Sequence, residues 1–327
     1  MHAFDFTVAA SADDAVDRAA GGAALLAGGT TLVDLMKLDV LTPRQVVDIN
    51  ALPLRGIAAG RHGLRIGALE RMSDVAAHPD VAAGYPVIAR ALVQSASPQL
   101  RNMASIGGNL LQRTRCGYFR DVHTPCNKRE PGSGCPAQAG ENRGHAVLGT
   151  STSCVATHAS DLAVALVALD AWVRLYSRAG DRLVRLVDFY RLPGDTPQLE
   201  NQLQQGELLT EVVVPALHWS TRSTYVKVRD RASYEFALAS AAVALDVRGR
   251  RIRQARVAAG GVGTVPWRLR AVERALRGRP LVPESFEAAA RSAADGARPL
   301  AHNGFKVALV QRTIVRALTE VARGVTA

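Results

Sequence analysis

Residues 25–37 read Leu-Leu-Ala-Gly-Gly-Thr-Thr-Leu-Val-Asp-Leu-Met-Lys, with the pair Gly28-Gly29 between a short apolar segment and a segment of helical spacing. Paired glycines let the backbone turn sharply and leave several N–H groups with no Cβ in front of them. Such a cluster of amides, with the hydroxyl groups of Thr30 and Thr31 beside it, suits a pyrophosphate. A tight turn is the simpler interpretation of this pair alone, and the pattern is not the G-x-G-x-x-G of a Rossmann fold.

A second glycine pair, Gly107-Gly108, lies in the stretch Ser105-Ile106-Gly107-Gly108-Asn109-Leu110. It is also flanked by side chains that form hydrogen bonds, the hydroxyl of Ser105 and the amide of Asn109. Each pair by itself is explained by a tight turn. Two such loops in one chain favour a nucleotide cofactor, but only modestly.

The segments around these loops alternate between strand and helix patterns and predict an α+β fold. Ser11 and Ser160 are placed as helix N-caps, and Ser73 begins a helix that should end before Pro79. A polar linker at 194–205 should lead to the last unit. The expected strands cover 4–8, 23–27, 46–49, 64–68, 172–177, 182–187, 225–228, 237–247 and 252–259, and the expected helices follow Ser11, Ser73, Ser160 and Pro266 and cover 32–37, 87–95 and 305–321.

All four cysteines of the chain, Cys116, Cys126, Cys135 and Cys154, fall in the stretch 113–154, which has neither helical nor strand periodicity. A structureless stretch of this length is uncommon in a compact domain and is usually functional or disordered. None of the four lies in an apolar segment, where lone core cysteines usually occur. The cysteine loop, as we call residues 113–154, is therefore expected to fold around something that thiolates hold.

The spacing C-x9-C-x8-C-x18-C leaves three interpretations of this loop. Two disulfides would suit an exported protein. Structural zinc usually uses closely spaced pairs of cysteines, which this spacing lacks. Four thiolates also hold a [4Fe–4S] cluster, although the known ferredoxin spacings are tighter. The spacing alone predicts either a four-thiolate site or two disulfides.

Composition narrows the class of protein further. Apolar residues make up 48% of the 327 residues, which supports a large core, and aromatic residues make up only 5%. No apolar run approaches the length of a membrane span, and residues 1–16 show no signal peptide. The net charge of +11 comes mostly from dispersed Arg, because only four Lys occur, at 37, 128, 227 and 306. Without a nucleic-acid motif, this dispersed charge ranks nucleic acid low as a partner.

Several motifs together resemble one family, the flavoproteins of the molybdenum hydroxylases. Residues 25–37 are similar to the first FAD-binding loop of the family, and residues 105–110 are similar to its second. Residues 159–166 look like the acidic segment that follows, and residues 227–237 look like the start of the family's C-terminal domain. The order and spacing match over nearly the whole chain. Jointly the motifs are specific for the family, although each is weak alone.

The resemblance implies FAD, bound by a two-part domain of the vanillyl-alcohol-oxidase/PCMH type that precedes a smaller α+β C-terminal domain. The implied units are 1–55, 56–215 and 216–327. Asp161 is implied to bond the ribityl or pyrophosphate region, and Lys227 to contact the flavin. The residues implied around the pyrophosphate are Leu26, Ala27, Gly28, Gly29, Thr30, Thr31, Leu32 and Val33 in the first loop, and Ser105, Gly108 and Asn109 in the second.

Most members of the family lack a cysteine loop. The version here is similar to the flavin subunit of bacterial aldehyde oxidoreductases, which implies a [4Fe–4S] cluster held by Cys116, Cys126, Cys135 and Cys154. Flavin subunits of 4-hydroxybenzoyl-CoA reductase or xanthine dehydrogenase type are the alternative. The nearby His123, His145 and His158 are interpreted as ordinary loop residues.

The resemblance also implies partners. Substrate would be oxidised on a large molybdenum-cofactor subunit, and electrons would cross a small [2Fe–2S] subunit to FAD on this chain and then reach an external acceptor. No nucleophile, acid–base pair or molybdenum motif is visible, so no catalytic residue is assigned. A self-sufficient flavin oxidase and a basic, zinc-containing binding protein stay open. The compartment is also open: the cytoplasm, or the periplasm if a partner carries the export signal.

Overall fold

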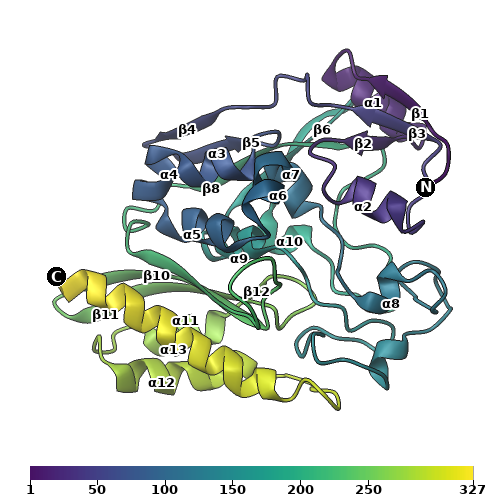
Figure 1. Ribbon diagram of the computed structural model, residues 1–327. Helices are drawn as coiled ribbons and strands as arrows, with labels where there is room; N and C mark the ends of the chain where they lie inside the picture. Colours follow the sequence, from purple (N-terminus) through teal and green to yellow (C-terminus); the bar gives the residue numbers. More distant parts are fainter. Residues whose placement is uncertain (327) are drawn as a thin grey trace.

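The structure, a computed structural model, describes residues 1–326, the last two by their backbone only, and contains three sheets (Figure 1). The first sheet is parallel, with the strand order β1-β3-β2. Helix α1 begins where expected, because the Ser11 hydroxyl accepts a hydrogen bond from the amide of Asp14 at 3.1 Å. The elements of this N-terminal unit are β1 (Asp5–Val8), α1 (Ala12–Ala20), β2 (Ala24–Leu26), α2 (Leu32–Lys37) and β3 (Gln45–Asp48).

The second sheet is antiparallel, with the strand order β4-β5-β8-β6-β7. Strand β8 returns from the end of this segment to lie between β5 and β6, so Val212 is opposite both Ile66 and Val173. The core of the unit lies between this sheet and the helices α3, α5 and α9. Its elements are β4 (Ile57–Gly60), β5 (Gly63–Gly67), α3 (Met72–Ala77), α4 (Pro79–Gly84), α5 (Pro86–Gln94), α6 (Pro98–Met103), α7 (Ile106–Leu110), α9 (Asp161–Ala168), β6 (Trp172–Ser177), β7 (Gly180–Arg185), α10 (Leu186–Phe189) and β8 (Leu208–Pro215).

The cysteine loop connects α7 to α9 and is almost free of regular structure, as its sequence predicts. It contains one short helix, α8 (Gly117–Arg120), and one 3-10 turn, η1 (Pro136–Gln138). Figure 1 shows the loop at one side of the molecule, next to α2 of the N-terminal unit. The loop therefore lies against the element that follows the first glycine pair.

The third sheet is antiparallel, with the strand order β12-β11-β10-β9. Its pleat divides the side chains between two cores: Ala241 and Val243 pack towards α11, α12 and α13, and Tyr225 and Ala242 pack towards α5 and α9. None of the described helices is long and apolar enough to cross a bilayer. The elements are β9 (Ser223–Val228), β10 (Ala239–Arg248), β11 (Arg251–Gly260), β12 (Trp267–Arg268), α11 (Arg270–Leu276), α12 (Pro283–Ala290), η2 (Arg291–Ala294) and α13 (Phe305–Thr326).

Three features differ from the sequence-based expectation. Helix α3 begins at Met72, and Ser73 lies inside it and donates to the Asp74 carboxylate instead of capping the helix. Residues 194–205 lead to β8 and not directly to the last unit. The elements that were not expected are the strands β4, β8 and β12 and the helices α4, α6, α7, α8, α10 and α12. Each sheet still draws its strands from a single predicted unit, and the boundaries between those units stay a prediction.

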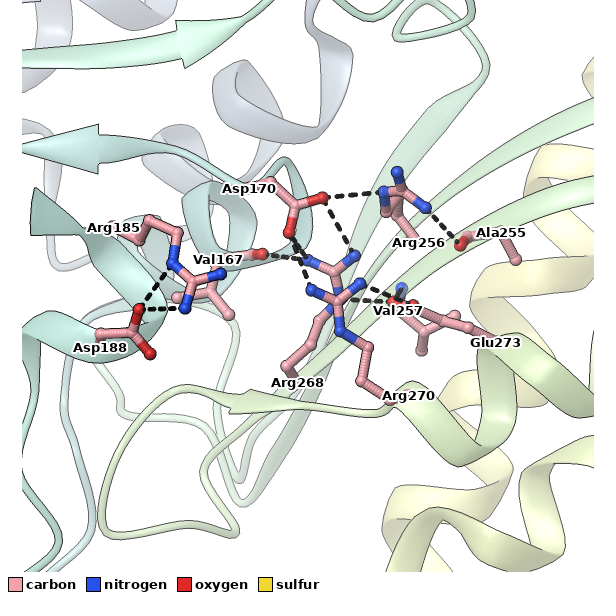
Figure 2. A network of polar contacts seen from close by, with 10 residues as sticks. All are labelled: Val167, Asp170, Arg185, Asp188, Ala255, Arg256, Val257, Arg268, Arg270 and Glu273. Carbon is pink, nitrogen blue, oxygen red and sulfur yellow. Dashed lines mark hydrogen bonds and ion pairs between the residues drawn. The ribbon is translucent and has the colours of Figure 1, made fainter.

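Helix α9 is buried along its whole length and lies between the second and third sheets. The residue just beyond it, Asp170, has a positive φ of 56°. Its carboxylate pairs with three arginines of the third sheet and α11: Arg268 at 2.8 Å, Arg256 at 3.0 Å and Arg270 at 3.1 Å (Figure 2). The C-terminal end of α9 is thereby attached to the last unit.

Arg268 is the centre of this network. Its side chain is 4% exposed and also bonds Glu273, which is 8% exposed, and the carbonyl oxygen of Val167 at the end of α9. Glu273 in turn accepts from the amide of Val257 at 2.8 Å. These buried charges are therefore paired and bonded, the condition under which buried ions are tolerated.

We expect Arg268→Met to destabilise the chain by about 3 kcal/mol, because it leaves buried partners without their cation. The control is Arg185→Met, which removes the ion pair with Asp188, also drawn in Figure 2, whose side chains are 56% and 53% exposed. That change should cost less than about 1 kcal/mol. Urea unfolding of the two variants gives the comparison, and equal losses would contradict the importance of the buried network.

Candidate functional site

The first glycine loop packs directly against the peptide that precedes the second. A Cβ built on Gly28 would lie 2.0 Å from the carbonyl oxygen of Met103, so only glycine fits there. Asn50 holds the other side of the loop, since its Nδ2 donates to the carbonyl oxygen of Ala27 at 2.9 Å. The two glycine pairs, distant in the sequence, are therefore neighbours.

The backbone amides of residues 28–32 point to no protein acceptor. Within the described part of the chain, no hydrogen bond uses the N–H groups of these five residues. Gly29 has a φ of 71°, and Leu26 and Val33 pack against it, each 3.3 Å from the position of a Cβ. A run of free amides around a left-handed residue is an anion-binding nest.

The second loop is different, because its amides already have acceptors. The amides of Ile106 and Gly107 donate to the carbonyl oxygens of Glu70 and Ala68 at 2.9 and 2.8 Å. The amide of Gly108 donates to the hydroxyl of Ser105, the N-cap of α7, at 3.2 Å. In this structure the second loop therefore presents the bare Cα of Gly108 to the groove, and the expected contact of Ser105, Gly108 and Asn109 with the pyrophosphate stays a prediction.

Asn109 connects the second loop to α9. Its Oδ1 accepts a hydrogen bond from the hydroxyl of Ser160 at 2.6 Å. Ser160 is the N-cap of α9, as expected, and its Oγ accepts from the amide of Ala163 at 3.0 Å. This bond places the next residue, Asp161, beside the glycine loops.

Asp161 and Lys227 form a buried ion pair with Nζ and Oδ2 2.7 Å apart. The same carboxylate accepts from the Tyr225 hydroxyl at 2.6 Å and the Ser95 hydroxyl at 3.1 Å. Burial, together with the neighbouring Asp161, raises the pKa of Tyr225 well above its usual value, so that hydroxyl remains a donor. Lys227 is 1% exposed and also donates to the carbonyl oxygen of Gln94, so it lies behind Asp161.

A groove passes between the two glycine loops. On one side lies a cavity of about 370 Å³ with a mainly apolar lining, and on the other lies one of about 470 Å³ with a more polar lining. Thr30, Thr31 and Gly108 line both cavities. The apolar side includes Leu25, Leu35, Ile49, Leu69 and Leu208, and the polar side includes Asp34, Asn109, Arg115, Asp161 and Tyr234.

The groove continues towards the cysteine loop. A third cavity, of about 290 Å³, shares Arg115, Asp161 and Phe236 with the polar side and extends to Cys116 and His145. A ligand of dinucleotide size would thus find one path from the N-terminal unit, past the glycine loops, to the edge of the third sheet.

All four cysteines are free thiols and line one enclosed space. Burial raises the pKa of the Cys116 thiol to about 11, and it also raises the pKa of Cys135 and Cys154. The amide of Ala156 donates to the sulfur of Cys154 at 3.5 Å. No group of three or more His, Cys, Asp or Glu side chains in residues 1–326 converges closely enough to hold a single metal ion.

Two carboxylates that the sequence analysis did not single out anchor the cysteine loop. Asp34 of α2 bonds Arg115 and Arg120 at 2.6 and 2.7 Å. Glu200 bonds Arg113 and Lys128 at 2.5 and 3.0 Å. Both are distant in the sequence from the arginines they bind, so the only sequence signal was the excess of Arg in the loop.

A small apolar cluster completes this anchor. Leu35 of α2 and Val40 pack with Phe119 and Cys126 of the loop. Helix α2 thus begins at the free amides of the first glycine loop and packs, one turn later, on a cysteine.

The three histidines in and near the cysteine loop have different environments. His123 is exposed, and the ring of His158 packs edge-on against Tyr190 with centroids 4.4 Å apart. His145 is buried, with its Nε2 3.2 Å from the sulfur of Cys116. Of the three, His145 is therefore the one whose ring nitrogen contacts a cysteine sulfur.

Comparison with known proteins decides the family. Residues 2–217 match the family described as the FAD binding domain in molybdopterin dehydrogenase, and residues 224–321 match the CO dehydrogenase flavoprotein C-terminal domain. The chain belongs to the molybdenum hydroxylase flavoproteins. The resemblance found in the sequence, the α+β fold and the assignment as an FAD-binding oxidoreductase subunit are confirmed.

Individual relatives of this flavoprotein agree. The aldehyde oxidoreductase FAD-binding subunit PaoB of Escherichia coli is 48% identical over 91% of each chain. The glyceraldehyde dehydrogenase medium chain of Sulfolobus acidocaldarius is 31% identical, over 78% of this chain and 74% of its own. A crystal structure of the carbon monoxide dehydrogenase of Hydrogenophaga pseudoflava that lacks the Mo-pyranopterin moiety contains a chain that superimposes with a TM-score of 0.75, at 26% identity over 97% of this chain and 96% of that chain.

Proposed function

We propose that this chain is the flavin subunit of a molybdenum-containing aldehyde oxidoreductase and passes electrons from a molybdenum subunit and a [2Fe–2S] subunit through FAD to an external acceptor. The observation that carries the proposal is the nest of free amides at 28–32, which opens into a groove of dinucleotide length. The aldehyde oxidoreductase subunit at 48% identity supports the substrate class. A flavin subunit of 4-hydroxybenzoyl-CoA reductase or xanthine dehydrogenase type is the alternative.

FAD would lie along the groove with its pyrophosphate at the first glycine loop. The free amides of 28–32 and the hydroxyls of Thr30 and Thr31 would bind the phosphate oxygens. The apolar cavity of about 370 Å³ would take the adenine, and the polar cavity of about 470 Å³ would take the flavin ring. Ser105 and Asn109 would hold the second loop in place rather than donate to phosphate.

The Asp161 carboxylate would form hydrogen bonds with the polar part of the flavin, because Asp161 lines the polar cavity. Lys227 lies behind Asp161 and does not line this cavity. The lysine would therefore act by holding Asp161 in its orientation through the ion pair. FAD accepts and releases electrons; the chain binds it, orients it and excludes water around it.

Gly108→Val tests the placement of FAD. A Cβ at Gly108 would meet only the Ser105 hydroxyl, at 2.9 Å, and would otherwise point into open space at the neck of the groove. The fold should survive while bound flavin is lost, by at least tenfold in occupancy. The control is Gly60→Ala, at a glycine with nothing within 4 Å. Flavin per chain is read from the visible spectrum, and wild-type flavin content in Gly108→Val would refute the placement.

We further propose that Cys116, Cys126, Cys135 and Cys154 hold one [4Fe–4S] cluster. Four free thiols line one space in a segment with little regular structure, so ligation would supply folding energy that apolar burial does not. A single zinc would need four sulfurs about 2.3 Å from one point. The metal content of the purified protein therefore distinguishes zinc from a cluster that binds each thiolate at a different iron.

Cys135→Ser should remove or degrade the cluster, because serine is a poor ligand for iron in such clusters. We expect less iron and acid-labile sulfide per chain and faster proteolysis within residues 113–154, while flavin content is kept. His123→Gln, at an exposed position of the same loop, is the control. Anaerobically purified wild-type protein that contains zinc, or two disulfides and no iron, would rule out the cluster.

We propose that substrate is oxidised on a large molybdenum-cofactor subunit and that a small [2Fe–2S] subunit delivers the electrons. The names of two relatives, an FAD-binding subunit and a medium chain, support a complex of several subunits. We also propose that the domains of this chain are the units 1–55, 56–215 and 216–327, each of which is built around one sheet.

The isolated chain, purified with flavin but without molybdenum, should not oxidise aldehydes, whereas the chain co-expressed with its two partners should. We expect at least a 100-fold difference in rate with an artificial electron acceptor. Rapid aldehyde turnover by the isolated chain would favour a self-sufficient flavin oxidase. Turnover of a purine or an aromatic acyl-CoA thioester, but not of aldehydes, by the full complex would favour the alternative complexes.

A further inference from the structure

His145 occupies the wall between the space lined by the four cysteines and the cavity that continues the flavin groove. Its side chain is buried, and its backbone is held independently of the ring. The His145 amide donates to the carbonyl oxygen of Asn142 at 2.9 Å, and its carbonyl oxygen accepts from Nδ2 of Asn303 at 3.3 Å. The backbone of His145 is therefore held in place without any contribution from a contact between the ring and sulfur.

The two ring nitrogens have unequal surroundings. Nε2 lies 3.2 Å from the sulfur of Cys116, and Nδ1 has no hydrogen-bond partner within the described chain. A neutral imidazole carries one N–H, and a thiolate can only accept. A proton on Nδ1 would bury an unpaired donor and turn a lone pair of Nε2 towards the lone pairs of sulfur. A proton on Nε2 instead gives that N–H an acceptor in the sulfur and leaves only a lone pair at Nδ1 without a partner.

We propose that His145 donates a hydrogen bond from Nε2 to the Cys116 sulfur and thereby raises the reduction potential of the iron–sulfur cluster. This inference rests on the cluster assignment made under Proposed function. Reduction adds one electron to the cluster and breaks no bond, and it increases the negative charge on the sulfurs. A donor at sulfur therefore stabilises the reduced form more than the oxidised form.

The position of Cys116 gives this bond a role in electron transfer. Arg115, the preceding residue, lines the polar cavity proposed for the flavin ring, and Cys116 itself lines the adjoining cavity. Cys116 is thus the ligand on the flavin side of the cluster. A bond at this sulfur would adjust how electrons divide between cluster and flavin, which makes His145 a positioning residue and not a catalytic one.

The test uses the complete complex with His145→Leu, His145→Gln and the exposed control His123→Gln. Redox titrations followed by electron paramagnetic resonance give the midpoint potential of the cluster, with iron and sulfide measured on the same samples. We expect His145→Leu to keep its iron and to shift the one-electron equilibrium about tenfold against reduction, about 59 mV. His145→Gln, whose amide can donate, should recover most of the shift, and the flavin midpoint should not move.

The outcomes separate the two proposals. A wild-type complex without iron in the loop overturns the cluster assignment and this inference together. An intact cluster with an unchanged midpoint in His145→Leu overturns only the role of His145. If His145→Leu loses iron, then a His145→Gln variant with a full cluster near the wild-type midpoint supports the hydrogen bond. Loss of iron in both variants would make His145 a ligand or a structural residue and overturn it.

Discussion

The buried carboxylate of Asp161 is the contact on which the shape of the groove depends. It is the first residue of α9, and its partners Ser95, Tyr225 and Lys227 come from the end of α5 and from β9. A carboxylate removed from water is costly unless it is paired and fully bonded. The second and third sheets therefore cannot shift relative to each other without exposing or orphaning this charge, and the wall of the groove stays where the three elements meet.

Asp170, just beyond the other end of α9, also attaches this helix to the last unit. Since α9 is attached to the last unit by Lys227 at its start and by Arg256, Arg268 and Arg270 just beyond its end, the third sheet is fixed in rotation as well as in position. The helix itself is rich in Leu, Val and Ala, whose apolar contacts are not directional, so the charged groups at its two ends add to its orientation. The Arg-rich composition supplies the guanidinium groups that a shared carboxylate needs.

The sequence was sufficient for what is local. Ser11 and Ser160 cap helices as expected, and Gly28-Gly29 lies between β2 and α2, where Gly28 has no room for a Cβ. The second pair differs from the expected tight turn, because Gly107 and Gly108 lie inside the short helix α7. The sequence was insufficient where the partner is distant. Strand β8 forms by pairing with β5 and β6, which are distant in the sequence. Asp34 and Glu200 likewise meet the arginines that they bind only in the folded chain. The sequence also does not distinguish the two loops, because both have a Gly-Gly pair beside a hydroxyl side chain. The amides of the first loop are free, whereas amides of the second donate to the carbonyl oxygens of Glu70 and Ala68.

Helix α2 has only six residues, and it makes contacts with neighbouring groups along its whole length. Thr31, at the start of the helix, belongs to the nest, and Leu35 packs on Phe119. Asp34 forms ion pairs with Arg115 and Arg120. A helix this short moves as one piece. A displacement of the part of the cysteine loop that α2 contacts would therefore also move the amides that face the groove. Because α2 contacts the loop at Arg115, Phe119 and Arg120 and not around Cys135, these contacts would keep the nest in place while a more distant part of the loop loosens.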